Sequence, residues 1–91
     1  MNFGQALEEL KQGKKLQREG WNGKGLFVVF QPSSDIQKNQ IRNEILNDHY
    51  KNSYTESMVI QPHFMIKNSN ETVSTWVPSV NDCLAEDWAV I

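Results

Sequence analysis

The stretch Arg18-Glu19-Gly20-Trp21-Asn22-Gly23-Lys24-Gly25 most constrains how this chain can fold, because three of its residues are glycines. Glycine adopts positive φ angles without steric cost and lets the backbone approach a ligand or another chain closely. A short extended segment, 16–18, precedes this stretch, and an aromatic and β-branched segment, 26–30, follows it. We therefore predict two strands that pair as a hairpin across a glycine turn, with Trp21 inside the turn.

The length and charge of the chain limit the classes of protein to which it can belong. Ninety-one residues predict a single domain over 1–91, and a chain this short buries only about 60–65% of its unfolded surface, so self-association is expected. A net charge of −2 argues against coating nucleic acid through its phosphates. No apolar run approaches the roughly 20 residues that span a bilayer, and residues 1–3 do not begin a secretory signal. We expect a cytoplasmic protein with no nucleic-acid or membrane partner.

The first residues carry the signals of a short amphipathic helix. Asn2 and Gln5 have the spacing of a capping box, and Gly13 suits a left-handed helix end. The helix is predicted to stop at about Gln12. Its apolar residues recur at helical spacing: Phe3, Ala6, Leu7 and Leu10.

The segment 34–55 is polar and rich in asparagine. Ile41 and Ile45, with Leu46 or His49, share one side of a helix predicted near 40–50 and capped by Asn39. We interpret 34–55 as a helical insertion of the kind that carries variable contacts or a lid.

The C-terminal part predicts a second hairpin and a closing strand. Strands are predicted over 58–66 and 72–77, joined by a turn at 67–71. Pro62 lies at a bulge or an edge of the first, because proline cannot donate to a ladder. Ser79 and Asp82 predict a capped helical turn, and 88–91 a final strand. The fold class is therefore α+β, an N-terminal helix packed on an antiparallel β-sheet with a helical insertion between two hairpins.

The residues that commonly carry chemistry form no recognised constellation. One cysteine, Cys83, and two histidines, His49 and His63, do not have the spacing of a zinc site, and Cys83 is expected to be buried. The acidic residues near the end are explained by capping or by a surface position. A nucleophile elbow and a Walker lysine are both missing from the sequence. We predict a protein that is not an enzyme and uses no metal or cofactor.

Two motifs together resemble a known family. The residues that carry the resemblance are Arg18, Gly20 to Gly25, Trp76, Ser79, Asp82 and Ala85-Glu86-Asp87-Trp88. They are similar to those of small phage and prophage proteins, once known only as a domain of unknown function, that are now named for Thoeris anti-defence proteins of the second type. The resemblance covers roughly the first and the last thirty residues, and segment 34–55 has no match.

The resemblance implies a binding protein that acts as a sponge. Members sequester a cyclic ADP-ribose isomer made by a bacterial immune TIR enzyme, without cleaving it. Similar proteins are homotetramers of helix-plus-sheet protomers with ligand pockets at subunit interfaces. Some relatives are associated with other cyclic nucleotide signals, and at least one similar protein is an anti-CRISPR factor.

The chemistry of such a ligand suggests roles for the residues of both motifs. A purine face stacks on tryptophan, and a pyrophosphate needs backbone amides and cations. Ribose hydroxyls and an exocyclic amine need small polar side chains. The candidates for stacking are Trp21, Trp76 and Trp88 with Phe27 behind them, those for pyrophosphate are Arg18, Gly23 and Lys24, and those for hydroxyl and amine groups are Asn22, Thr75, Ser79 and Asp82.

Some alternatives stay open from the sequence. Trp88 can be plain core, and Arg18 can form an ion pair with Glu19, Asp82 or Asp87. A protein-directed inhibitor, such as an anti-CRISPR factor, would carry its contacts on segment 34–55. A structural phage domain would use its aromatic residues only as core.

Overall fold

The computed structural model describes residues 1–21 and 25–91, which divide into two compact units. The first unit comprises Met1–Gln31 and His63–Ile91, and the second comprises Pro32–Pro62. The predicted insertion over 34–55 lies within the second unit. Each unit is described by itself.

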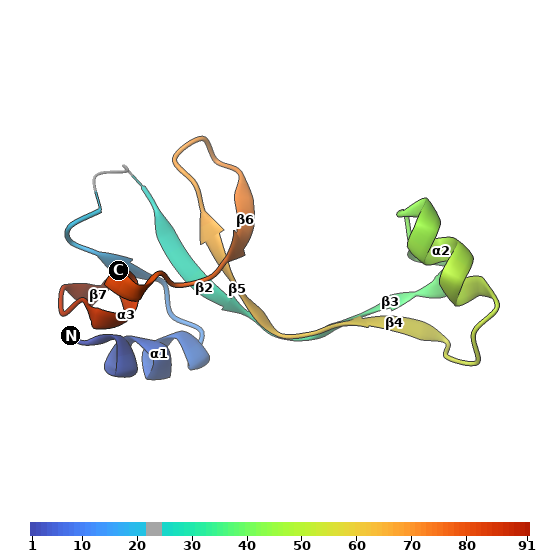
Figure 1. Ribbon diagram of the computed structural model, residues 1–91, viewed down its shortest axis with the longest axis horizontal. Coiled ribbons are helices and arrows are strands. Elements are labelled where there is room, and N and C mark those ends of the chain that lie inside the picture. The colour runs from blue at the N-terminus through green and yellow to red at the C-terminus, as the bar shows by residue number, and fades with distance from the viewer. Residues whose placement is uncertain (22–24) are drawn as a thin grey trace. The chain divides into compact units, whose positions relative to one another are not determined.

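The first unit is a five-stranded antiparallel sheet with two helices (Figure 1). The strands lie in the order β6-β5-β2-β1-β7. The predicted α+β class, with an N-terminal helix on an antiparallel sheet, is confirmed. The elements are α1 (Phe3–Lys11), β1 (Leu16–Arg18), β2 (Phe27–Gln31), β5 (His63–Lys67), β6 (Val73–Trp76), α3 (Val80–Leu84) and β7 (Trp88–Val90).

Helix α1 begins and ends at the residues that its sequence predicts. The Asn2 side chain accepts a hydrogen bond from the Gln5 amide, and the Gln5 side chain accepts one from the Asn2 amide. The C-cap is Gln12, and Gly13 follows with a φ of 88°, where glycine avoids a steric cost. Ala6 and Leu10 are completely buried under the helix.

The pairing register decides which side chains share a face of the sheet. Leu16 pairs with Val28, and Arg18 pairs with Trp88. Phe30, Phe64 and Trp76 are aligned across three strands. Because side chains alternate between faces, these residues lie on the face that α1 covers. The buried core on this face comprises Ala6, Leu10, Leu16, Val28, Trp76 and Trp88.

Both predicted hairpins are confirmed within this sheet. Strand β1 pairs with β2 across the glycine stretch, and β5 pairs with β6. Strand β1 also pairs with the closing strand β7, so the segment 16–18 lies between two neighbours. Strand β7, from the C-terminal end of the chain, thus forms an edge of the sheet beside the N-terminal strand β1.

The second unit is a two-stranded antiparallel sheet with a helix. Strand β3 (Ser34–Gln37) pairs with β4 (Ser57–Ile60), and the chain between them forms the 3-10 helix η1 (Lys38–Gln40) and α2 (Glu44–Lys51). The sequence analysis predicted the helix but not β3. Its apolar residues are too few to give a clear alternation.

Two predicted boundaries in this region are wrong. Helix α2 is capped by Asn43 rather than Asn39, since the Asn43 side chain accepts from the Ile45 and Leu46 amides at 3.1 Å each. The predicted strand 58–66 is instead two strands, β4 and β5, in different sheets. Pro62 lies between them, where its missing N–H interrupts the ladder.

The prediction for the single cysteine is also wrong. Cys83 was expected to be buried, but it is exposed.

Candidate functional site

Three tryptophans from separate elements contact one another on the helix-covered face. Trp21 and Trp88 have ring centroids 5.4 Å apart at 78°, and Trp21 and Trp76 are 6.5 Å apart at 73°. Trp76 and Trp88 lie 6.0 Å apart at 75°. These are edge-to-face contacts, which aromatic rings favour over a stacked sandwich. We call Trp21, Trp76 and Trp88 the tryptophan cluster.

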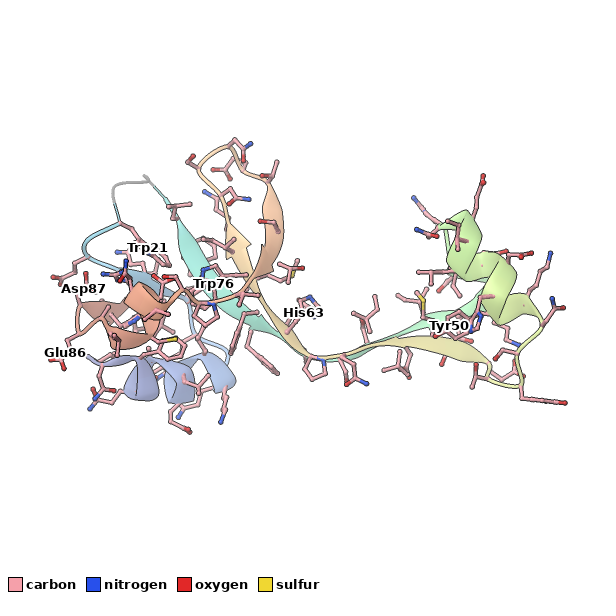
Figure 2. All side chains as sticks on the ribbon, viewed as in Figure 1. Trp21, Tyr50, His63, Trp76, Glu86 and Asp87 are labelled. Carbon is pink, nitrogen blue, oxygen red and sulfur yellow. The ribbon has the colours of Figure 1, made fainter. Side chains whose placement is uncertain are left out.

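Exposure differs among the members of the tryptophan cluster. Trp88 is 2% exposed and Trp76 is 9% exposed, whereas Trp21 is only partly buried. Phe3 of α1 contacts both Trp76 and Trp88. The burial of Trp88 matches the alternative in which this residue is core. Trp21 and Trp76, both labelled in Figure 2, come from the glycine stretch and from β6.

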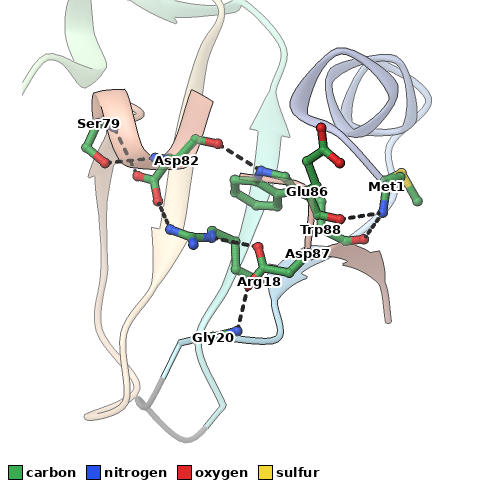
Figure 3. A network of polar contacts seen from close by, with 8 residues as sticks. All are labelled: Met1, Arg18, Gly20, Ser79, Asp82, Glu86, Asp87 and Trp88. Carbon is green, nitrogen blue, oxygen red and sulfur yellow. Dashed lines mark hydrogen bonds and ion pairs between the residues drawn. The ribbon is translucent and has the colours of Figure 1, made fainter. Parts of the chain in front are cut away.

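Arg18 joins two carboxylates beside this cluster (Figure 3). Its Nε donates to Asp87 Oδ1 at 2.9 Å, and its Nη1 donates to Asp82 Oδ1 at 3.1 Å. Arg18 therefore forms the ion pairs that the sequence left open as an alternative, with Asp82 and with Asp87. We call Arg18, Asp82 and Asp87 the Arg18 cluster. It links the end of β1 to α3 and to the residue before β7.

The hydrogen bonds of the Arg18 cluster shift the pKa values of its members. The bonds to Asp87 and then Asp82 raise the pKa of Arg18. The Arg18 guanidinium, followed by the Gly20 amide, lowers the pKa of the Asp87 carboxyl. At Asp82 burial acts to raise the pKa, but hydrogen bonds from Ser79 and Arg18 together outweigh it and lower the pKa. All three groups are charged near neutral pH.

Asp82 also holds the start of α3. Its Oδ2 accepts from the Ser79 amide at 3.0 Å, and its own amide donates to the Ser79 hydroxyl at 3.1 Å. The predicted cap is confirmed. The Asp82 carbonyl oxygen accepts from Trp88 Nε1 at 3.0 Å. Ser79 and Asp82 are therefore both occupied in fixing the helix turn next to the tryptophan cluster.

Asp87 is a site residue that the predicted ligand set does not include. Its Oδ2 accepts from the Gly20 amide at 2.9 Å, and its carbonyl oxygen accepts from the Glu19 amide at 3.0 Å. The Trp21 amide in turn donates to the Arg18 carbonyl oxygen at 3.1 Å. From the sequence, Asp87 was considered only as a possible ion-pair partner of Arg18. The hydrogen bond to Gly20 depends on the β1–β7 register, which the sequence does not specify.

Two predicted site residues lie on the other face of the sheet. Phe27 aligns with Lys67 and Val73, and Thr75 aligns with Met65 and Val29. The prediction that Phe27 lies behind the tryptophans is wrong, because the strand register turns its side chain away from them. Lys15 and Lys67 place their ammonium groups 5.2 and 6.0 Å from the Phe27 ring centroid.

The remaining predicted site residues, Asn22, Gly23 and Lys24, lie outside the described residues. Within the described ranges, no three histidine, cysteine or acidic side chains gather as metal ligands. The same part of the chain encloses no cavity of ligand size.

None of the helices in residues 1–21 and 25–91 has the length and apolar character needed to cross a bilayer.

The family of the chain is shown by comparison with known proteins. The family model described as the Thoeris anti-defense 2-like domain matches residues 1–91, and the chain belongs to this family. One relative is Thoeris anti-defense 2 of Bacillus phage SP01. It is 38% identical over 91 residues, which are 100% of this chain and 94% of the relative. The family supports a phage anti-defence role for the chain.

Proposed function

We propose that the protein binds and sequesters a cyclic ADP-ribose-type nucleotide, the signal of a TIR-dependent immune system, without converting it. It would act in the cytoplasm of the bacterial host and keep the signal from the downstream effector. The observation that carries the proposal is the tryptophan cluster, with its partly exposed Trp21 in the glycine stretch 18–25, in a chain of the Thoeris anti-defense 2-like family.

The aromatic part of the ligand suits Trp21. Stacking of a base on an aromatic ring contributes roughly 1 to 3 kcal/mol. Trp76 and Trp88 contact Trp21 edge-on, so they support its ring rather than compete for the same ligand face. We propose that Trp21 stacks on the ligand and that Trp76 contacts the ligand beside it. Trp88 would support both rings.

The ribose hydroxyls and the pyrophosphate of the ligand need two different kinds of protein group. The Arg18 cluster holds one cation and two carboxylates, and this excess of negative charge repels a pyrophosphate. Carboxylates instead accept hydrogen bonds from ribose hydroxyls. We propose Asp82 with Ser79 for the hydroxyl groups, and Lys24 with the glycine-stretch amides, including Gly23, for the pyrophosphate. Asn22 and Thr75 remain proposed contacts from the sequence.

A second subunit would complete the pocket in a homotetramer. Val80 and Leu84, the first and last residues of α3, are 74% and 75% exposed, and Val77, shortly before the helix, is 81% exposed. Apolar side chains exposed together mark interaction surfaces. A partner chain covering them would bury the edge of the tryptophan cluster and desolvate a bound nucleotide.

Calorimetric titration with cyclic ADP-ribose isomers tests this function. We expect saturable binding to the native protein and loss of binding by Trp21→Ala with the fold retained by circular dichroism. Val73→Ala is a matched control, since Val73 lies on the same strand as Trp76 but on the opposite face of the sheet and is not a proposed ligand contact. If the protein binds another cyclic nucleotide signal but none of the cyclic ADP-ribose isomers, that other signal is the ligand and the proposed ligand class is wrong.

A protein-directed inhibitor, such as an anti-CRISPR factor, is a second candidate because the second unit exposes apolar side chains. Ile45 is 82% exposed and Val59 is 52% exposed. Replacing residues 38–52 by a short turn separates the two functions. Inhibition would vanish if the second unit binds a protein target, whereas nucleotide binding would survive if the tryptophan cluster forms the pocket.

A further inference from the structure

We propose that Asp87 is a positioning residue for the tryptophan cluster, which rests on the proposed function and adds a residue to it. Its two carboxylate oxygens accept from the Arg18 side chain and from the Gly20 backbone amide, and the segment that these residues belong to carries Trp21. Asp87 acts through the Gly20 backbone and does not itself contact the ligand.

The first point of attachment is the Arg18 side chain. Arg18 Nε donates to Asp87 Oδ1 at 2.9 Å, while Arg18 Nη1 is held by Asp82 on α3. The guanidinium is therefore fixed between two carboxylates from different elements. Asp87 is next to Trp88, which pairs with Arg18 across β7 and β1.

The second point of attachment is the backbone itself. Asp87 Oδ2 accepts from the Gly20 amide at 2.9 Å, one residue before Trp21. The fit around this bond is tight, because a Cβ added at Gly20 would lie 2.9 Å from Asp87 Oδ2. The Glu19 amide bonds to the Asp87 carbonyl oxygen at 3.0 Å, so consecutive amides leading to Trp21 converge on Asp87.

The consequence concerns the pose of the Trp21 ring. The ring stands edge-on to Trp88 at a centroid distance of 5.4 Å, and the backbone that carries it is one of the restraints on where its outer face points. A ligand that stacks on a ring already in place avoids the cost of ordering that side chain on binding. Arg18 and Gly20 donate to different oxygens of Asp87, and asparagine replaces one of those oxygens by an NH₂ donor, so in this geometry one of the two hydrogen bonds is lost.

Fluorine NMR of the protein labelled with fluorinated tryptophan tests the proposal without any ligand. The chain has three tryptophans, and Trp→Phe substitutions assign their resonances. We expect Asp87→Asn to shift or broaden the Trp21 resonance more than that of Trp76. Asp82→Asn is the matched control, since it removes the other carboxylate of Arg18 but leaves the bond to Gly20. It should move the Trp21 resonance less than Asp87→Asn does.

Two results would overturn the proposal: an unmoved Trp21 resonance in folded Asp87→Asn, or an equal Trp21 shift in Asp82→Asn. If Asp87→Asn does not fold, Gly20→Ala provides the second test, because its Cβ displaces the carboxylate while keeping its charge. An unmoved Trp21 resonance in that variant also overturns the proposal.

Titration with cyclic ADP-ribose isomers then separates this inference from the proposed function. If the native protein binds one, Asp87→Asn should weaken binding about 3- to 10-fold, the usual cost of ordering one side chain. Lost binding with an unmoved Trp21 resonance would make Asp87 a direct ligand contact and contradict positioning. If the native protein binds none, the proposed function fails while the NMR result stands by itself.

Discussion

The indole nitrogen of Trp88 donates a hydrogen bond to the carbonyl oxygen of Asp82 at 3.0 Å. This buried bond joins the closing strand β7 to helix α3. Asp82 therefore contributes to the site through both its carboxylate, which pairs with Arg18, and its backbone.

Trp88→Phe should destabilise the protein by about 1–3 kcal/mol, because it leaves the buried Asp82 carbonyl oxygen without this donor. Urea denaturation followed by circular dichroism measures the change. Trp21→Phe is the control, since Trp21 is only partly buried, and it should cost less. Equal losses in the two variants would contradict a structural role specific to Trp88.

Acid should weaken the Arg18 cluster. Asp82 and Asp87 both have pKa values below the ordinary value in the folded chain. Their stabilising contribution is therefore complete above the unfolded pKa of about 3.9, and it is lost as the pH falls through the lower folded pKa. Thermal unfolding between about pH 7 and pH 3 should show the stability gap between the native protein and Asp87→Asn closing at the acid end. A gap that widens at low pH would reverse this assignment.

Asn43→Ala should shorten or unfold α2, since the Asn43 side chain accepts from the first amides of that helix. Loss of such a cap typically costs about 0.5–2 kcal/mol. Hydrogen exchange of the α2 amides reports the effect locally. Asn39→Ala is the matched control, because Asn39 is an exposed residue of η1, and equal exchange in both variants would contradict the observed cap.

Val80→Glu and Leu84→Glu should break the proposed subunit contact while preserving the fold. Both side chains are at least 74% exposed in the single chain, so a charge there costs little unless a partner covers it. Light scattering should show a smaller assembly, and nucleotide binding should fall with it. Ile45→Glu tests the second unit in the same way, and a smaller assembly in that variant alone would move the interface there.

The local elements were predictable where single residues specify them. Asn2 with Gln5 produced the predicted capping box, and Ser79 with Asp82 produced the predicted helix cap. Aromatic and β-branched segments, with the turn residues between them, identified the hairpins. These signals act within a few residues of chain, so they need no knowledge of tertiary contacts.

The site was predictable only in part, because it depends on register between distant strands. Which face Phe27 occupies follows from its pairing with Lys67, and no local pattern fixes that pairing. The role of Asp87 likewise depends on β7 lying beside β1, across 69 residues of chain. The strand β3 was missed because it has too few apolar residues to show a clear alternation. The Asn43 cap was missed because the polar second unit offers more than one asparagine that could cap the helix.

The central claim is that the protein holds its ligand without changing it. The most direct measurement is to incubate the purified protein with cyclic ADP-ribose isomers, remove unbound ligand, denature the protein by heat and assay what is released. The account predicts recovery of intact ligand in proportion to the protein, and none from Trp21→Ala. Release of a processed product would contradict sequestration and make the protein an enzyme.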